Sequence, residues 1–138
     1  YMEIKCGTLD WFIDELKENQ VFVFGSNLAG KHGGGAAKNA LKFGAEWGKA
    51  DGMQGRSYGI PTVSHDIQSM LTVQRIKIYV DRFISYATQH PELEFLVTEI
   101  GCGLAHYEPS DIAPLFEKAL YLENVYLPQR FIECLKVL

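Results

Sequence analysis

The chain has 138 residues, a length that suits one domain spanning residues 1–138. Its composition is 47% hydrophobic and 12% aromatic, which excludes a disordered chain and provides enough apolar side chains for a hydrophobic core. The formal net charge is -4, so the surface as a whole favours neither nucleic acid nor an anionic membrane as a partner.

The three cysteines, Cys6, Cys102 and Cys134, are odd in number and widely spaced. They form no CxxC pair and no disulfide framework, which favours a reducing, cytoplasmic setting. No apolar run reaches the roughly 18 residues of a membrane span, and we recognise no signal peptide. The histidines and Cys102 lack a metal-ligand spacing, so we expect neither a metal nor another cofactor.

The first part of the chain predicts a helix, a strand and a second helix. Residues 8–18 have apolar positions at helical spacing and Thr8 as an N-cap, and they predict a helix. Residues 21–24 are a continuous apolar run, which predicts a strand buried on both faces. Residues 35–44 follow as a helix whose small alanines allow close packing on a sheet.

Glycines interrupt the chain between residues 44 and 56 and predict an irregular segment. This segment contains Trp47 and Met53, and it is either a pocket wall or a solvent-facing connection. Residues 57–62 then predict a short strand that ends at its proline, Pro61.

The second part of the chain repeats the alternation. Residues 72–89 carry an apolar stripe at helical spacing and predict the clearest helix of the sequence. Residues 95–100 predict the next buried strand, and Ser110 or Asp111 is expected to cap the helix that follows. The last predicted elements are a short strand over residues 124–127 and, over residues 131–135, a helical turn or a C-terminal tail.

This alternation predicts an α/β domain with a largely parallel sheet between layers of helices. Such sheets bind ligands beyond the carboxyl ends of their strands. Two glycine-bearing loops, within residues 25–35 and 101–107, follow strands at such ends. We therefore expect the two loops to converge on one crevice.

The first loop contains four glycines from Gly30 to Gly35. Backbone N–H groups that run into a helix N-terminus form an anion site, whereas the alternative is an ordinary strand–turn–helix connection. The spacing fits neither a P-loop nor the dinucleotide-binding glycine motif. The pattern therefore predicts a phosphate-bearing small molecule bound by backbone groups.

Four side chains near the two loops are candidates for chemistry. Asn27 follows a strand, where its amide can bind ribose hydroxyls or serve as a turn residue. His32 is a phosphate contact or general acid–base, or else a surface loop residue. Glu99 can activate a water for glycosidic cleavage, but we favour a solvated or salt-bridged glutamate. Cys102 can be a nucleophile, but we favour a buried thiol whose backbone N–H binds phosphate.

The order of strand, Asn27, glycine-rich loop and alanine-rich helix resembles the first ligand loop of macro domains. In that family the stretch is an apolar strand, Asn-Ala-Ala-Asn, a few residues, Gly-Gly-Gly and a helix. Residues 100–107 are similar to the family's second loop, which holds a diphosphate, and residues 57–62 to its short central strand. The resemblance covers residues 20–127 and looks like a divergent branch from bacteria and phages.

The resemblance implies a three-layer α/β/α fold with a mixed, largely parallel central sheet and a pocket for ADP-ribose. Asn27 would face the distal ribose, and Tyr107 would stack on or flank it. Gln20 stands near the position of the family's adenine-contacting aspartate, which leaves the base open. The ligand-binding residues expected from the two loops are Gly25, Ser26, Asn27, Leu28, His32, Gly33, Gly34, Gly35, Ala36, Gly101, Cys102, Gly103, Leu104, Ala105 and Tyr107.

The leading hypothesis is therefore a domain that binds ADP-ribose or a related NAD-derived nucleotide, with ADP-ribosylated protein as a further partner. A second hypothesis is an enzyme, either an ADP-ribosyl hydrolase or an ADP-ribose phosphoester hydrolase, with Asn27, His32 and Glu99 as catalytic residues. A third is an interaction module whose pocket is non-functional. The sequence leaves the oligomeric state open.

Overall fold

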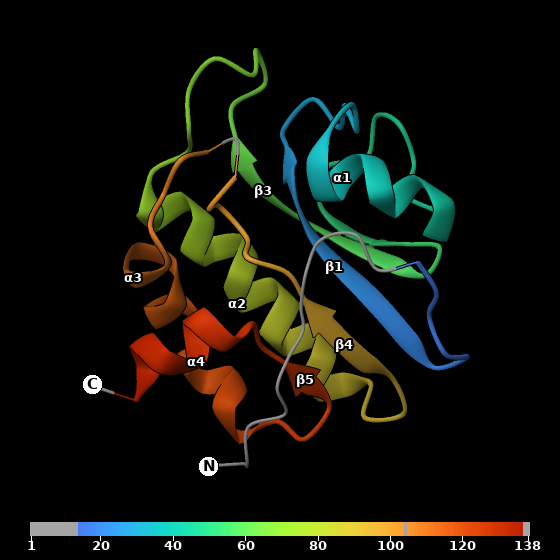
Figure 1. The fold of residues 1–138 in the computed structure, drawn as a ribbon. Coiled ribbons are helices and arrows are strands. Elements are labelled where there is room, and N and C mark those ends of the chain that lie inside the picture. The colour runs from blue at the N-terminus through green and yellow to red at the C-terminus, as the bar shows by residue number, and fades with distance from the viewer. Residues whose placement is uncertain (1–13, 104, 137–138) are drawn as a thin grey trace.

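The computed structural model describes residues 14–103 and 105–136 and has an α/β fold (Figure 1). Its strands form one sheet in the order β2-β3-β1-β4-β5, in which only β2 runs antiparallel to its neighbour. This confirms the mixed, largely parallel sheet. The strands are β1 (Gln20–Asn27), β2 (Gly52–Gln54), β3 (Ser57–Val63), β4 (Glu94–Val97) and β5 (Val125–Tyr126).

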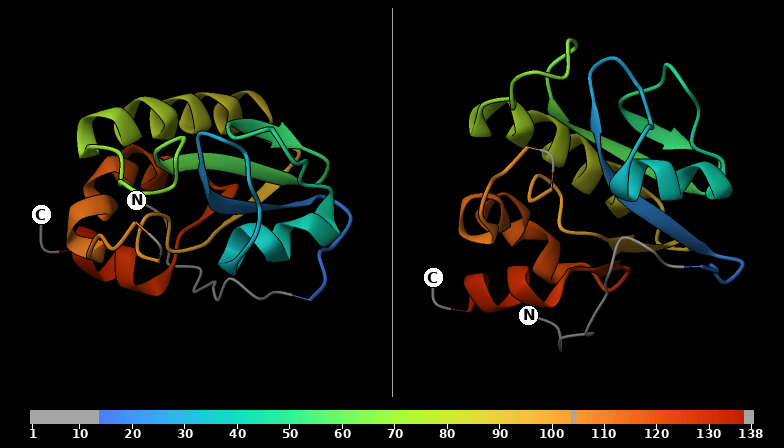
Figure 2. Two further views of the ribbon diagram at one scale, coloured as in Figure 1. Left: turned by 90° about the horizontal axis from the view of Figure 1, so that it is seen from above. Right: turned by 45° about the horizontal axis from the view of Figure 1, so that its top comes forward.

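Helical segments connect the strands and cover the sheet. They are α1 (Gly35–Ala40), the 3-10 helix η1 (Leu41–Phe43), α2 (Val73–Gln89), α3 (Pro109–Ile112), the 3-10 helix η2 (Ala113–Tyr121) and α4 (Gln129–Leu135). Figure 2 shows α1 and α2 on opposite faces of the sheet, which makes the fold three-layered. None of the described helices combines the length and the apolar character that a membrane crossing requires.

Alternating side chains of β1 place the two halves of the core. Val21 and Val23 belong to the larger cluster, which α2, α3, η2 and α4 complete. Phe22 and Phe24 belong to the smaller cluster, which α1 and η1 complete through small residues such as Ala37 and Ala40. A strand with both faces buried explains why residues 21–24 are continuously apolar.

Helix α2 forms where the sequence predicts it. The Thr72 hydroxyl accepts a hydrogen bond from the N–H of Arg75 at 3.2 Å and so caps the first turn. The side chains of Ile76, Val80 and Phe83 are completely buried on one stripe of the helix. Through this stripe α2 packs against the buried side chains of β1, β3 and β4 in the larger core cluster.

Several predicted boundaries are wrong. Residues 44–56 are not wholly irregular, because Gly52–Gln54 form β2 by pairing with β3. Pro61 does not end β3, which continues to Val63. The strand predicted over residues 95–100 is the shorter β4, and the chain leaves the sheet after Val97.

The predicted helix ends also differ. Of the helix predicted over residues 8–18, residues 14–17 are extended or irregular, and residues 8–13 lie outside the described residues. The helix predicted over residues 35–44 changes to 3-10 geometry at Leu41. Glu108, rather than Ser110 or Asp111, is the N-cap of α3, with Asp111 completing a capping box.

Candidate functional site

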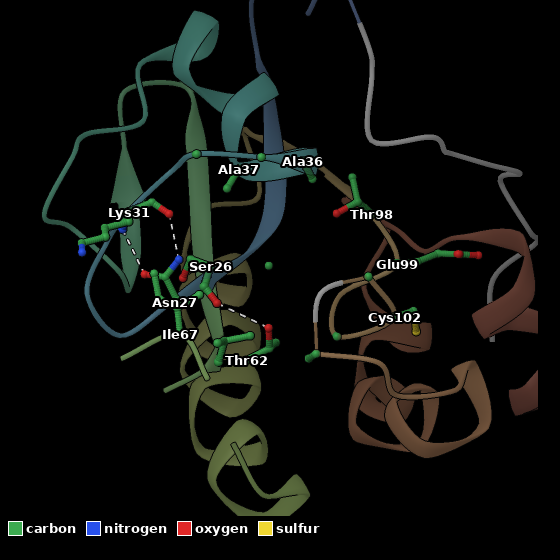
Figure 3. Close-up of a pocket in the computed structure, with 18 of the residues that line it drawn as sticks. Ser26, Asn27, Lys31, Ala36, Ala37, Thr62, Ile67, Thr98, Glu99 and Cys102 are labelled. Carbon is green, nitrogen blue, oxygen red and sulfur yellow. Dashed lines mark hydrogen bonds between the residues drawn. The ribbon is translucent and has the colours of Figure 1, made fainter. Parts of the chain in front are cut away.

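A cavity of about 670 Å³ lies beyond the carboxyl ends of β1, β3 and β4. Figure 3 shows Asn27 and Lys31 on one side of it and Glu99 and Cys102 on the other. The position is the one expected for a ligand site in a parallel α/β sheet. The cavity is lined by Gly25, Ser26, Asn27, Lys31, Gly33, Gly34, Gly35, Ala36, Ala37, Trp47, Thr62, Val63, Ile67, Thr98, Glu99, Gly101, Cys102, Gly103 and Ala105.

The first wall begins at Asn27, the last residue of β1. Its side-chain amide donates to the carbonyl of Lys31 at 2.7 Å and accepts from the N–H of Lys31 at 3.0 Å. The N–H of Gly30 donates to the Asn27 carbonyl at 2.9 Å and closes the turn. The structure thus gives Asn27 the turn role, although the residue also lines the cavity. One amide hydrogen and one oxygen lone pair are left for a ligand.

Gly30 lies against the segment that follows α1 and η1. Its φ is 70°, and a Cβ at this position would lie 2.4 Å from the carbonyl carbon of Gly48. The N–H of Gly48 also donates to the Gly30 carbonyl at 2.9 Å. Both the left-handed backbone and the close approach therefore require glycine at position 30.

We expect Gly30→Ala to destabilise the fold by at least about 2 kcal/mol, because it combines backbone strain with a backbone clash. Gly33→Ala is the control in the same loop, since Gly33 has no positive φ, is not the N-cap, and an added Cβ would meet no described atom within 4 Å. Its expected change is below about 0.5 kcal/mol. Urea unfolding of both variants checks the difference, and equal losses would contradict it.

The wall continues through Gly33, Gly34 and Gly35 into the first turn of α1. An added Cβ at any of the three would meet no described atom within 4 Å. Gly34 is the N-cap and provides no side-chain cap, and the first turn contains no acidic residue. The N–H groups at the start of α1 therefore face the cavity without a capping oxygen among the described residues. Lys31 adds an exposed ammonium group to this wall.

The second wall is the turn after β4. The Thr98 hydroxyl donates to the Val23 carbonyl at 2.7 Å and ties the start of the turn to β1. Gly101 has a φ of 79°, and a Cβ there would lie 3.2 Å from the Ile112 side chain, so the turn requires glycine. In the described part of the chain, no hydrogen bond uses the N–H of Gly101 or Gly103.

Cys102 lies in this turn but has neither of the roles considered from the sequence. Its N–H donates to the Glu99 carbonyl at 3.1 Å, so the expected backbone contact with phosphate is wrong for this residue. Burial and, secondarily, the charge of Glu99 raise the pKa of the Cys102 thiol to about 12. The thiol is therefore protonated at neutral pH and is a poor nucleophile.

We expect iodoacetamide to alkylate Cys102 at least about a hundredfold more slowly at pH 8 than it alkylates free cysteine, because the thiolate fraction is so small. The rate should rise with pH beyond the range in which an ordinary thiol is already ionised. Peptide mass spectrometry over time separates Cys102 from Cys6 and Cys134. Rapid alkylation of Cys102 at pH 7 would contradict this assignment.

Glu99 forms a salt bridge, one of the two structural alternatives that we favoured from its sequence position. Its carboxylate accepts from Nε of Arg130 at 2.7 Å and from the terminal guanidinium nitrogen at 2.5 Å. Figure 3 shows its side chain directed away from Asn27 and toward the C-terminal helices. A carboxylate held by a guanidinium on both oxygens is a weak general base.

Three further predicted ligand residues are not among those that line the cavity. His32 is completely buried, and its Nε2 lies 2.8 Å from the Glu46 carbonyl, so it is no surface histidine. Leu28 packs against the larger core cluster. The Tyr107 hydroxyl donates to the Leu71 carbonyl at 2.6 Å. Leu104 lies outside the described residues.

Sequence reasoning missed part of the cavity lining. Thr62 and Val63 end β3, and Thr98 directly follows β4, so their positions at strand ends were a usable signal. Ile67 comes from the loop after β3 and has a φ of 63°, which is unusual for a β-branched residue. Its place in the wall has no local sequence signal.

A second cavity of about 570 Å³ shares Val63, Ile67 and Ala105 with the first. His106, which follows Ala105 and lines only this second cavity, also has a positive φ of 63°. No three His, Cys, Asp or Glu side chains within residues 14–103 and 105–136 are grouped as metal ligands would be.

Comparison of the chain with protein-family models, with curated proteins and with solved structures found no match. The resemblance to macro domains therefore stays a prediction from the two glycine-rich stretches. The α/β architecture and the common cavity of these stretches are observed in the structure itself.

Proposed function

We propose that the chain binds ADP-ribose or a related NAD-derived nucleotide in the cavity beyond β1 and β4. The observation that carries the proposal is that the two glycine-rich segments, which are about 66 residues apart in sequence, line the same cavity. Its volume of about 670 Å³ lies within the usual range of small-molecule sites, roughly 300–1,000 Å³.

The charges around the cavity support an anionic ligand. Lys31 lines it and has no ion pair with a described residue, whereas the lining carboxylate of Glu99 is neutralised by Arg130. The uncapped start of α1 adds the positive end of backbone dipoles. Backbone N–H groups from Gly33, Gly34 and Gly103 are then available as donors to a diphosphate.

The hydroxyl groups of the cavity support ribose as the neighbouring part of the ligand. Ser26 donates to the Ala50 carbonyl at 2.5 Å, and Thr98 donates to the Val23 carbonyl. The Thr62 hydroxyl donates to the Ser26 carbonyl at 3.4 Å. Because these hydroxyl hydrogens are used within the protein, the oxygens are left as acceptors for ligand hydroxyls.

The hydrolase alternative has weaker support among the residues first considered for it. His32 does not line the cavity, Glu99 is paired with Arg130, and the Cys102 thiol is protonated at neutral pH. Binding, with free ADP-ribose or an ADP-ribosylated protein as the partner, is therefore the function that we propose first. An interaction module with a non-functional pocket is the third alternative.

Calorimetry with ADP-ribose, NAD and ADP tests the proposal, with Asn27→Ala and Tyr121→Ala as variant and control. We expect heat of binding from at least ADP-ribose, a loss of affinity in Asn27→Ala, and no change in Tyr121→Ala, which is exposed and does not line the cavity. No heat with any of the three would contradict nucleotide binding. Turnover of ADP-ribosylated protein by the parent would establish the hydrolase alternative.

Lys31→Met is expected to weaken ADP-ribose binding by about 3–10-fold, because it removes the exposed cation near the phosphates. Lys38→Met is a matched control, since Lys38 is exposed on α1, which follows the loop of Lys31, and does not line the cavity. The effect of Lys31→Met should shrink as salt rises from 50 to about 500 mM, where screening removes attraction between exposed charges. Equal affinities for the two variants at low salt would contradict the role of Lys31.

A further inference from the structure

Trp47 is the large aromatic side chain in the cavity wall, and it is unusually exposed. The residue lines the cavity and has 60% of its surface exposed to solvent. An indole ring at this exposure leaves a large apolar surface in water, in the same cavity wall as Lys31 and the glycines of the first loop. Such a surface loses its contact with water when a flat ligand group covers it.

The ring of Trp47 packs against His32, which in turn packs against Phe24 of the sheet. His32 packs edge-on against Phe24 of β1, with ring centroids 5.3 Å apart and an interplanar angle of 88°. Trp47 lies over His32, with centroids 6.0 Å apart and an angle of 36°. Phe24 and His32 are completely buried, so the exposed indole packs on side chains that are themselves held in the core.

The backbone on both sides of Trp47 is also fixed to neighbouring segments. The Glu46 carbonyl accepts from Nε2 of His32, and the N–H of Glu46 donates to the Gln54 side chain at 2.8 Å. On the other side, the N–H of Gly48 donates to the Gly30 carbonyl. These bonds tie residues 46–48 to the first glycine-rich loop and to β2, which holds the indole at one place in the cavity wall.

The arrangement also accounts for His32. Nε2 of His32 donates to the Glu46 carbonyl, and the buried Nδ1 has no hydrogen-bond partner among the described residues. A buried polar atom without a partner is costly, so the imidazole must contribute something else at this position. Supporting the indole and fixing the Glu46 carbonyl are the contacts that it makes.

We propose that Trp47 stacks on the planar ring of the bound nucleotide, with Lys31 and the glycine-rich loops holding the phosphates. This inference rests on the proposed function and extends it, since it requires an aromatic ring as well as a phosphate in the ligand. Aromatic stacking tolerates any planar ring, so a nucleobase and a nicotinamide ring share the chemistry. His32 is a positioning residue that acts through Trp47.

The experiment compares three probes that share a ribose and a phosphate: ADP carries a purine, nicotinamide mononucleotide carries a pyridinium, and ribose 5-phosphate carries neither ring. We expect Trp47→Ala to weaken binding of at least one ring-bearing probe by about 10-fold or more and to change ribose 5-phosphate affinity by less than about twofold. Trp47→Phe should retain most of the affinity. The probe that loses affinity identifies the ring.

A spectroscopic readout separates stacking from a structural role. In a Trp11→Phe background Trp47 is the only tryptophan of the chain, so its fluorescence should be quenched by the ring-bearing probe and not by ribose 5-phosphate. Equal loss of affinity for all three probes in Trp47→Ala, or binding of a ring-bearing probe without quenching, would overturn the inference. If ADP-ribose binds the parent and Trp47→Ala equally well, the inference fails and the proposed function stands. If the parent binds no nucleotide, both fail.

Discussion

Gly34→Asp is expected to raise the dissociation constant for ADP-ribose by at least about a hundredfold, which corresponds to about 2.7 kcal/mol. Gly34 is the N-cap of α1 and lines the cavity, and its extended backbone accepts any side chain. A carboxylate there would occupy the N–H groups of the first turn and would repel the phosphates of the ligand. Calorimetry measures the change directly.

Gly34→Asn is the matched control, because asparagine has the same size and caps a helix about as well as aspartate. Both variants should fold at least as stably as the parent, since each adds a cap that Gly34 lacks. Blocking of the N–H groups weakens binding in both, but only aspartate adds charge repulsion. We therefore expect the aspartate variant to bind at least about 10-fold more weakly than the asparagine variant. Equal affinities would mean that no phosphate lies near the start of α1.

Phe83→Ala is expected to lower the free energy of unfolding by about 3–5 kcal/mol. Phe83 is completely buried on α2, where its ring contacts Tyr58, Phe95 and Phe116 at centroid distances of 5.1, 5.4 and 6.3 Å. The substitution leaves a cavity between α2, the sheet and η2, which the rigid surroundings cannot fill. For a chain of this size the melting temperature should fall by roughly 10–20 °C.

Ile78→Ala controls for the change of residue on the same helix, since Ile78 has 59% of its surface exposed. Its expected effect on the free energy of unfolding is within about 0.5 kcal/mol. Thermal and urea unfolding of both variants test the pair. A loss below about 1 kcal/mol in Phe83→Ala would contradict the assignment of α2 to the centre of the larger core.

Local hydrophobic periodicity correctly predicted the elements whose pattern lies within their own residues. The apolar stripe of α2 and the continuous apolar run in β1 can be recognised from neighbouring residues alone, and both elements are present. The edge strand β2 was missed because Gly52–Gln54 have no strand pattern and depend on pairing with β3. Gly59 of β3 allows the chain just before β2 to approach, since a Cβ at position 59 would lie 2.5 Å from the Ala50 carbonyl oxygen.

The part of the candidate site that lies at the ends of strands was predictable from the sequence. Both glycine-rich loops follow parallel strands, so their convergence follows from the topology. The pairing of Glu99 with Arg130 joins residues 31 positions apart and has no local signal. The same is true of His32, whose burial depends on Glu46 and on Trp47, both supplied by the segment after α1. Long-range packing therefore decides which loop side chains face the cavity.

A crystal structure of the chain with ADP-ribose tests the central claim most directly. We predict density for the diphosphate between residues 33–36 and residues 101–103, with N–H groups of Gly34 and Gly103 within hydrogen-bond distance of phosphate oxygens. The ribose next to it should contact the amide of Asn27. Density for ADP-ribose at another surface, or an empty cavity in crystals grown at saturating ligand, would contradict the claim that these two loops form a nucleotide site.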